Sequence, residues 1–166
     1  RALADASLVL ISDTAHGPRI EAVTQIAAAA GAQRGMMLAD ARTLCPAVAT
    51  APSDPAGDLA FLEQLALWAQ RWGPWSALDA PDGLLVDVTA VPHLFGGETL
   101  LLEDVREAFA RRRLAVRMAI APTAGAAWAL AHHAPDGTIV EHHDDIERAL
   151  SDLPVAALRL DQDVVT

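Results

Sequence analysis

Short apolar runs separated by turn residues organise the first third of the chain. Residues 7–12 (SLVLIS) are apolar and branched, which is typical of a buried strand. Residues 20–24 are expected to form a hairpin with this strand across the turn at 13–18. Two short helices are predicted next, at 25–30 with Gly31 as its end and at 38–45, stopped by Pro46.

A long helix is predicted after Asp54 from the spacing of large apolar residues. Asp54 is suited to cap its first turn, Pro55 to occupy its first position and Gly73 to end it. One apolar stripe, which we interpret as core packing, recurs at spacings of three and four and consists of Leu59, Leu62, Leu65, Trp68 and Trp72.

Strands and helices alternate in the second half. After the turn at 81–83 we predict a strand at 84–89, a loop at 95–97 and a helix at 98–113. The remaining elements are a strand at 115–120, a helix at 123–133, a strand at 138–141 and a helix at 144–150. This order predicts an α/β layer with helices on one face of a sheet.

Composition indicates a globular domain and limits its chemistry. Of the 166 residues, 52% are hydrophobic and 20% are charged. The single cysteine, Cys45, excludes an internal disulfide and a multi-cysteine zinc site, and we interpret it as a packing residue. No apolar run approaches the ~18 residues of a membrane span, and no signal peptide pattern is present, so a cytoplasmic location is expected.

Charge gives one candidate interaction surface. The net charge of −10 disfavours tight nucleic-acid binding, because phosphate contacts need Lys and Arg. A basic cluster at one helix-to-strand connection is the exception, and it consists of Arg106, Arg111, Arg112, Arg113 and Arg117. It is either a solvated helix end or a phosphate-contacting patch with Arg111, Arg112, Arg113 and Arg117 as DNA-binding candidates.

Two further patterns are interpreted as structural. Residues 64–68 (QLALW) are similar to peptides that bind bacterial sliding clamps, but their position inside a helix favours core packing. The pairs at 132–133 and 142–143 are adjacent histidines, which point about 100° apart on a helix. Each pair therefore offers at most one ligand to an ion, and we predict no metal site.

Three stretches, in this order, resemble the Y-family DNA polymerases. They are 35–46 (GMMLADARTLCP), 82–89 (DGLLVDVT) followed by 94–97 (LFGG), and 119–122 (AIAP) at the start of a helix. Together with 74–79 (PWSALD), they are most similar to ImuB-type mutagenesis proteins, which are divergent members of the family with an inactive polymerase core.

The resemblance implies an α/β (α+β) fold. We expect a Y-family polymerase palm, ferredoxin-like with its first strand absent, and a small fingers-like subdomain. The fingers-like portion with an edge hairpin is expected at 1–51, the palm-like domain at 52–141 and the start of a truncated thumb-like element at 142–166. Because the sequence begins at Arg1, we expect it to be part of a longer protein. We also expect this part to begin after the first palm strand of the family.

The family's metal ligands are incomplete in this sequence. Such polymerases use two metal ions roughly 4 Å apart, clamped by shared carboxylates. The adjacent Asp-Glu pair of the palm motif corresponds to Asp82 and Gly83, so only a vestigial Asp remains. Asp87 points to the other face of the strand and lies about 16 Å further along, so it cannot share an ion with Asp82. No cofactor is expected.

The family's triphosphate-binding residues are also replaced. Its Tyr and Arg in the fingers correspond to Gln25 and Ala28, and its Asn-Lys pair and later Lys correspond to Thr123, Ala124 and Trp128. None is a cation, and phosphoryl transfer depends on positioned charge.

We therefore predict a non-catalytic scaffold in DNA repair and translesion mutagenesis. By resemblance, the full protein would bridge a sliding clamp, an error-prone replicative-type polymerase and a RecA-like protein, with weak DNA binding in this part. One alternative is an active translesion polymerase using Mg²⁺ held by Asp82 and an N-terminal Asp. Another is an unrelated α/β domain.

Overall fold

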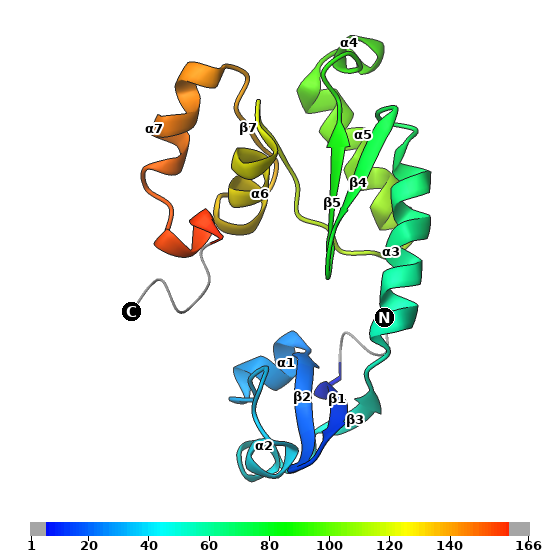
Figure 1. Cartoon of the computed structure of the whole chain (residues 1–166), viewed down its shortest axis with the longest axis vertical. Coiled ribbons are helices and arrows are strands. Elements are labelled where there is room, and N and C mark those ends of the chain that lie inside the picture. Colours follow the sequence, from blue (N-terminus) through cyan, green and yellow to red (C-terminus); the bar gives the residue numbers. More distant parts are fainter. Residues whose placement is uncertain (1–5, 160–166) are drawn as a thin grey trace. The chain divides into compact units, whose positions relative to one another are not determined.

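The computed structural model describes residues 6–159 and divides the chain into two compact units (Figure 1). The units are Arg1–Ala60 and Phe61–Thr166, so the division falls inside the long helix α3, Pro55–Ala69. The expected fingers-like, palm-like and thumb-like portions stay predictions, and residues 160–166 of the last lie outside the described residues.

The first unit contains a three-stranded sheet in the order β2-β1-β3. Strand β1, Leu8–Thr14, pairs antiparallel with β2, Gly17–Val23, which confirms the predicted hairpin. On its other edge β1 pairs in parallel with β3, Ala49–Pro52, which the sequence patterns did not predict. Helices α1, Gln25–Ala29, and α2, Leu38–Leu44, confirm the two predicted short helices.

Local hydrogen bonds fix the start and end of α1. The Thr24 hydroxyl accepts from the amides of Ala27 at 3.4 Å and Leu8 at 3.1 Å, so one side chain caps the helix and ties it to β1. Gly31 follows the helix with a φ of +98°, a left-handed conformation that favours glycine, as predicted. The unit closes over a core of buried apolar side chains that includes Val9, Ile20 and Ala41.

The second unit begins with most of α3 and alternates strands and helices. The α3 cap is as predicted, because Asp54 Oδ1 accepts from the Gly57 amide at 3.0 Å. The elements that follow are β4 (Trp75–Asp79), β5 (Gly83–Asp87), α4 (Pro92–Phe95), α5 (Glu98–Arg111), β6 (Ala119–Ile120), α6 (Ala124–His133), β7 (Thr138–Ile139), α7 (Ile146–Leu150) and two 3₁₀ turns, η1 (His143–Asp145) and η2 (Val155–Leu158).

Aromatic side chains of α3 and α5 form the centre of this unit's core. The rings of Trp68 and Trp72 lie 4.7 Å apart and those of Trp68 and Phe109 lie 5.2 Å apart, both edge to face. The Trp72 indole donates to Asp104 Oδ2 at 2.6 Å, which satisfies its buried N–H. Of the predicted stripe, Leu62 and Trp72 are buried, whereas the expectation for Leu59 was wrong because it is exposed.

Three expectations for this half need correction. The predicted single layer is not formed, because the described strands make two separate pairs, antiparallel β4-β5 and parallel β6-β7. The strand expected at 115–120 is reduced to Ala119–Ile120, since only these residues find a partner strand. Phe95 belongs to the short helix α4, which Pro92 begins and Gly96 ends, and not to a loop.

Candidate functional site

An apolar cleft of about 520 Å³ lies within the second unit, lined by β5 on one side and by the β6 region and α6 on the other. Its apolar walls include Leu84 and Val86 of β5 and Met118 and Ile120 around β6. Asp79 and Asp82 are the carboxylates among its lining residues. Asp82 and Gly83, the residues that the sequence resemblance matches to the palm motif, therefore line this cleft.

Asp82 lies in the exposed turn between β4 and β5. Within residues 6–159, no three His, Cys, Asp or Glu side chains gather in a way that could hold a metal ion. The other carboxylate, Asp79, is already paired with Arg159, whose Nη2 lies 2.7 Å from its Oδ1. Within the part of the chain that the structure describes, neither carboxylate has the neighbours that a two-metal site needs.

Gly83 lies close to Asp79, so a side chain at this position would require a neighbour to shift. A Cβ placed there would lie 2.9 Å from the carbonyl oxygen of Asp79 and 3.1 Å from its Cβ. Asp79 and Gly83 are paired residues of the β4-β5 hairpin, so relieving the contact would require the backbone to shift. Glycine at this position, which the sequence resemblance matches to the family's Glu, thus avoids a close contact with the Asp79 backbone.

Asp87 is held at the far end of β5 by local hydrogen bonds. Its Oδ1 accepts from the Thr89 hydroxyl at 2.6 Å and from the Thr89 amide at 2.9 Å. These bonds, first the hydroxyl and then the amide, hold the pKa of the fully exposed Asp87 carboxyl below its ordinary value. The carboxylate is engaged in a turn and not directed to Asp82.

The residues matched to the triphosphate site provide no cation. Gln25 and Ala28 are exposed on α1 of the first unit. In the second unit, Thr123 caps α6 by accepting from the Ala126 amide at 3.2 Å, and Ala124 begins that helix.

Trp128, at the position of the family's later Lys, lies in an aromatic and cationic cluster. Its ring stacks on His132 with centroids 4.1 Å apart, and the Arg159 guanidinium lies 4.5 Å from its centroid. Trp128, Asp79 and Asp82 all line the cleft, so the structure brings these sequence positions together. Sequence analysis missed Arg159, which is 80 residues from Asp79 and gives no local signal.

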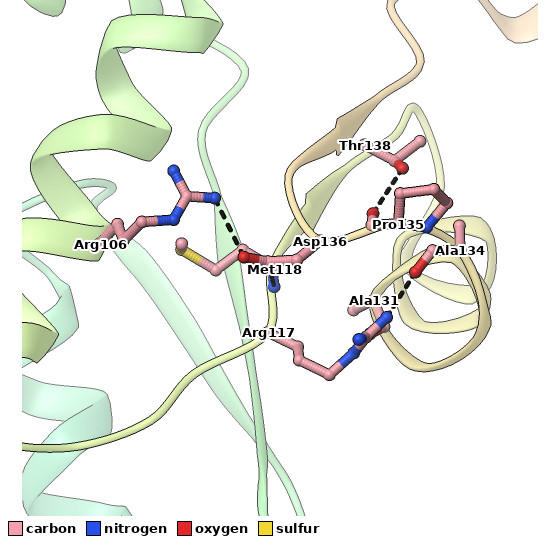
Figure 2. Close-up of polar contacts among 8 residues, drawn as sticks. All are labelled: Arg106, Arg117, Met118, Ala131, Ala134, Pro135, Asp136 and Thr138. Atoms are coloured by element: carbon pink, nitrogen blue, oxygen red, sulfur yellow. Dashed lines mark hydrogen bonds and ion pairs between the residues drawn. The ribbon is translucent and has the colours of Figure 1, made fainter.

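Two arginines of the basic cluster bind the protein itself (Figure 2). Arg106 pairs with Asp136 at 3.1 Å. Arg117 donates from Nε to the Ala131 carbonyl at 2.7 Å and from Nη2 to the Ala134 carbonyl, which satisfies groups at the C-terminal end of α6. These contacts join α5, the segment before β6 and the turn after α6.

Asp136 is the centre of this network. Its Oδ1 accepts from the Met118 amide at 2.8 Å, in addition to the ion pair with Arg106. Partial burial raises the pKa of Asp136, but the Met118 amide, the Arg106 hydrogen bond and the charges of Arg106 and Arg117 outweigh it. The pKa of this carboxyl therefore lies below its ordinary value.

The other three arginines are exposed at the end of α5. Arg111 makes an exposed ion pair with Glu107 at 3.4 Å, and the Arg112 guanidinium lies 3.8 Å from the Trp68 ring centroid. Arg113 follows with a φ of +60°. Arg71, which sequence analysis did not include, lies 5.4 Å from the Trp72 ring. Arg111, Arg112 and Arg113 stay candidates for DNA contact.

The remaining sequence motifs occupy structural positions. The clamp-like segment lies inside α3, with Leu65 and Trp68 half-buried and Leu67 exposed. Cys45 is half-buried, with its sulfur 3.2 Å from the Ser7 hydroxyl oxygen. Among the described residues, no helix is both long and apolar enough for a membrane span.

Comparison with known proteins places the chain in a family. The model of the impB/mucB/samB family matches residues 1–132. The protein ImuB of Caulobacter vibrioides is 48% identical over 126 residues, which cover 76% of this chain and 27% of that protein. The chain thus spans about a quarter of this relative's length.

Solved structures with the same fold include DNA polymerases. DinB from Sulfolobus solfataricus matches 97% of this chain and 48% of its own, with a TM-score of 0.78 and 17% identity. A Y-family DNA polymerase chimera matches 99% of this chain and 50% of its own, with a TM-score of 0.75 and 16% identity. These likenesses confirm the predicted fold class.

Proposed function

The chain belongs to the impB/mucB/samB family, and from this premise we propose that it is a polymerase-like core that has lost nucleotide transfer and acts as a scaffold. Family membership excludes the unrelated α/β domain. The scaffold acts in the response to DNA damage, where it supports repair and translesion mutagenesis without joining nucleotides itself.

The observation that carries this proposal is the geometry at Gly83. Joining nucleotides requires carboxylates that clamp two metal ions, and the second of the adjacent pair would have to begin at this residue. A Cβ there would lie 2.9 Å from the Asp79 carbonyl oxygen, so a side chain at this position would require the hairpin backbone to shift. This close contact supports the proposal that the position no longer serves metal binding.

Charge in the cleft supports the same conclusion. The Arg159 guanidinium neutralises Asp79, one of the two carboxylates that line the cleft. At the position of a family Lys stands Trp128, which is covered by Arg159 and His132. Among the described residues that line the cleft, Arg117 is the arginine, and it donates to main-chain carbonyls. Asp82 is the carboxylate of this lining that has no ion pair with a described residue, so a Mg²⁺ ion would meet few ligands here.

The scaffold's partners follow from the resemblance to ImuB-type proteins. The full-length protein would bridge a sliding clamp, an error-prone replicative-type polymerase and a RecA-like protein in the cytoplasm. DNA contact in this part is assigned to the exposed arginines at the end of α5. No cofactor is needed for this role.

Primer extension by the full-length protein tests the proposal. With Mg²⁺, all four nucleotides and a primed template, we expect no extension from the wild-type protein or from Asp82→Ala. A Y-family polymerase assayed in parallel shows that the substrate is usable. Extension that Asp82→Ala abolishes would establish the active translesion polymerase instead.

A further inference from the structure

We propose that a surface groove beside α3 is a docking site for an acidic amphipathic segment of another protein. This α3 groove has a volume of about 370 Å³, and its lining residues are Phe61, Gln64, Leu65, Trp68, Arg112 and Leu114. Leu65 and Leu114 also line the cleft described above, so the two hollows are neighbours within the second unit. The inference holds whether or not the protein joins nucleotides.

One wall of the α3 groove follows from the spacing of large residues on the helix. Phe61, Leu65 and Trp68 lie four and three positions apart, so their side chains share one face of α3. The adjoining face, with Leu62 and Ala66, is buried in the core. Phe61 is 48% exposed and Leu65 and Trp68 are half-buried, so this wall leaves apolar surface open to solvent.

The other wall is the connection from α5 to β6, which backbone hydrogen bonds hold in place. The Leu114 amide donates to the Phe109 carbonyl at 3.1 Å, and Arg113 between them has a φ of +60°. This is the left-handed turn that closes many helices, and it directs the chain back toward α3. As a result the Arg112 guanidinium lies 3.8 Å from the centroid of the Trp68 ring.

The groove is cationic although the chain carries a net charge of −10. Arg112 lies over the Trp68 ring, and the Arg71 guanidinium lies 5.8 Å from the same centroid. Within residues 6–159, neither of these two arginines forms an ion pair. A carboxylate of a partner would complete them, because guanidinium groups bind carboxylates through paired hydrogen bonds.

The lining favours a peptide over nucleic acid. A nucleic-acid strand stacks its bases on open aromatic faces and needs cations along its length. Here Arg112 already covers the Trp68 ring, and Leu65 and Leu114 are aliphatic. Leucine-like side chains of an amphipathic helix fit such walls, and an Asp or Glu beside them would meet the arginines.

The α3 groove uses different arginines from those that the Discussion tests for DNA contact. Arg112 lines the groove, whereas Arg111 and Arg113 do not. Arg111 is also engaged with Glu107 of its own helix. Peptide docking and DNA contact can therefore be separated by changing residues of the groove that carry no charge.

Binding of a designed peptide to the full-length protein tests the groove. The probe is a fluorescein-labelled amphipathic helix of about four turns, with leucines on one face and glutamates beside them. We expect binding in the micromolar range by fluorescence anisotropy. Phe61→Ala and Arg112→Ala should each weaken it by about fivefold or more, because one loses an apolar wall and the other the partner of the carboxylate.

Matched controls separate docking from general effects of substitution. Leu67→Ala also truncates a side chain of α3, but Leu67 is 68% exposed and outside the lining, so the affinity should not change. Circular dichroism verifies that each variant is folded. The same peptide with glutamine in place of glutamate should bind wild-type protein at least about fivefold more weakly.

Three outcomes would overturn the proposal. The first is no binding of the acidic peptide, and the second is equal affinity of the Phe61→Ala and Leu67→Ala proteins. The third concerns oligothymidylate, whose binding to the full-length protein should be insensitive to Phe61→Ala. A loss of oligothymidylate binding in that variant would assign the groove to nucleic acid instead.

Discussion

The two units differ in how completely their sheets are covered. In the first unit the central strand β1 has a partner on each edge, and Val9 and Ile20 are both 0% exposed. In the second unit β5 has one partner among the described strands, and its apolar residues stay half-buried beside a cleft. The sheet of the first unit therefore has a fully buried centre, whereas the strand pairs of the second unit leave apolar side chains and a strand edge partly uncovered among the described residues.

The largest expected effect is a loss of stability when a fully buried side chain of the first unit is removed. Ile20→Ala removes a fully buried side chain from the centre of the sheet and leaves a cavity. We expect the free energy of unfolding of this unit to fall by about 2–5 kcal/mol. Urea denaturation followed by circular dichroism measures it, with the exposed Ile26→Ala as the matched control. A loss as small as that of the control would contradict the complete core.

Charge reversal tests whether the second unit contacts DNA through the arginines at the end of α5. Arg111→Glu combined with Arg113→Glu should weaken binding to DNA by about tenfold at low salt and lower its salt dependence. Arg34→Glu combined with Arg42→Glu makes the same charge change on exposed residues of the first unit and should have less effect. Fluorescence anisotropy over a salt titration compares them. Equal behaviour would assign the α5 arginines to a solvated helix end.

The hydrogen bond and ion pair of Asp136 should make the stability of the second unit depend on pH. Asp136→Asn should cost about 1 kcal/mol at neutral pH, because the carboxylate is only partly buried and its ion pair with Arg106 is exposed. The folded-state pKa of Asp136 is lowered, so its contribution is present above the unfolded value of about 3.9 and lost as the pH falls through the folded value.

Thermal unfolding of both proteins from pH 7 downward checks this sign. The difference between wild type and Asp136→Asn should shrink as the medium becomes acidic. A difference that grows toward low pH would show that the carboxylate does not stabilise the unit in its charged form.

The smallest effect is expected at the open edge of the second unit. Leu85 is half-buried beside the cleft, so Leu85→Ala in the chain beginning at Arg1 should cost less than about 1 kcal/mol. A cost comparable to that of Ile20→Ala would mean that the cleft is already closed, and the contrast between the units would fail. Urea denaturation again provides the comparison.

The elements that the sequence predicts best have local causes. Asp54 and Gly31 place the start of α3 and the end of α1 through side-chain and backbone rules that involve neighbouring residues. Strand β3 (ATAP) was missed because it has small residues and a proline, and it exists through its parallel pairing with β1. Strand β4 was missed because it shows no apolar alternation and leaves Trp75 74% exposed.

In the candidate site, too, the sequence predicted the features with local causes and missed the long-range contacts. The sequence predicted the turn that contains Asp82, because turn residues are neighbours in sequence, and Gly83 begins β5 directly after it. The contacts that determine what the site can do are long-range, and they join Asp79 to Arg159, Arg112 to Trp68 and Arg106 to Asp136. No periodicity or spacing predicts such pairs, because they depend on packing between elements.

The central claim is that this cleft does not hold the substrates of nucleotide transfer. A crystal structure of the full-length protein with primed DNA, a non-hydrolysable nucleotide and Mn²⁺ tests it most directly, because anomalous scattering locates the ion. We expect no nucleotide and no Mn²⁺ at Asp82. A nucleotide in the cleft with its phosphates bridged to Asp82 by Mn²⁺ would contradict the account.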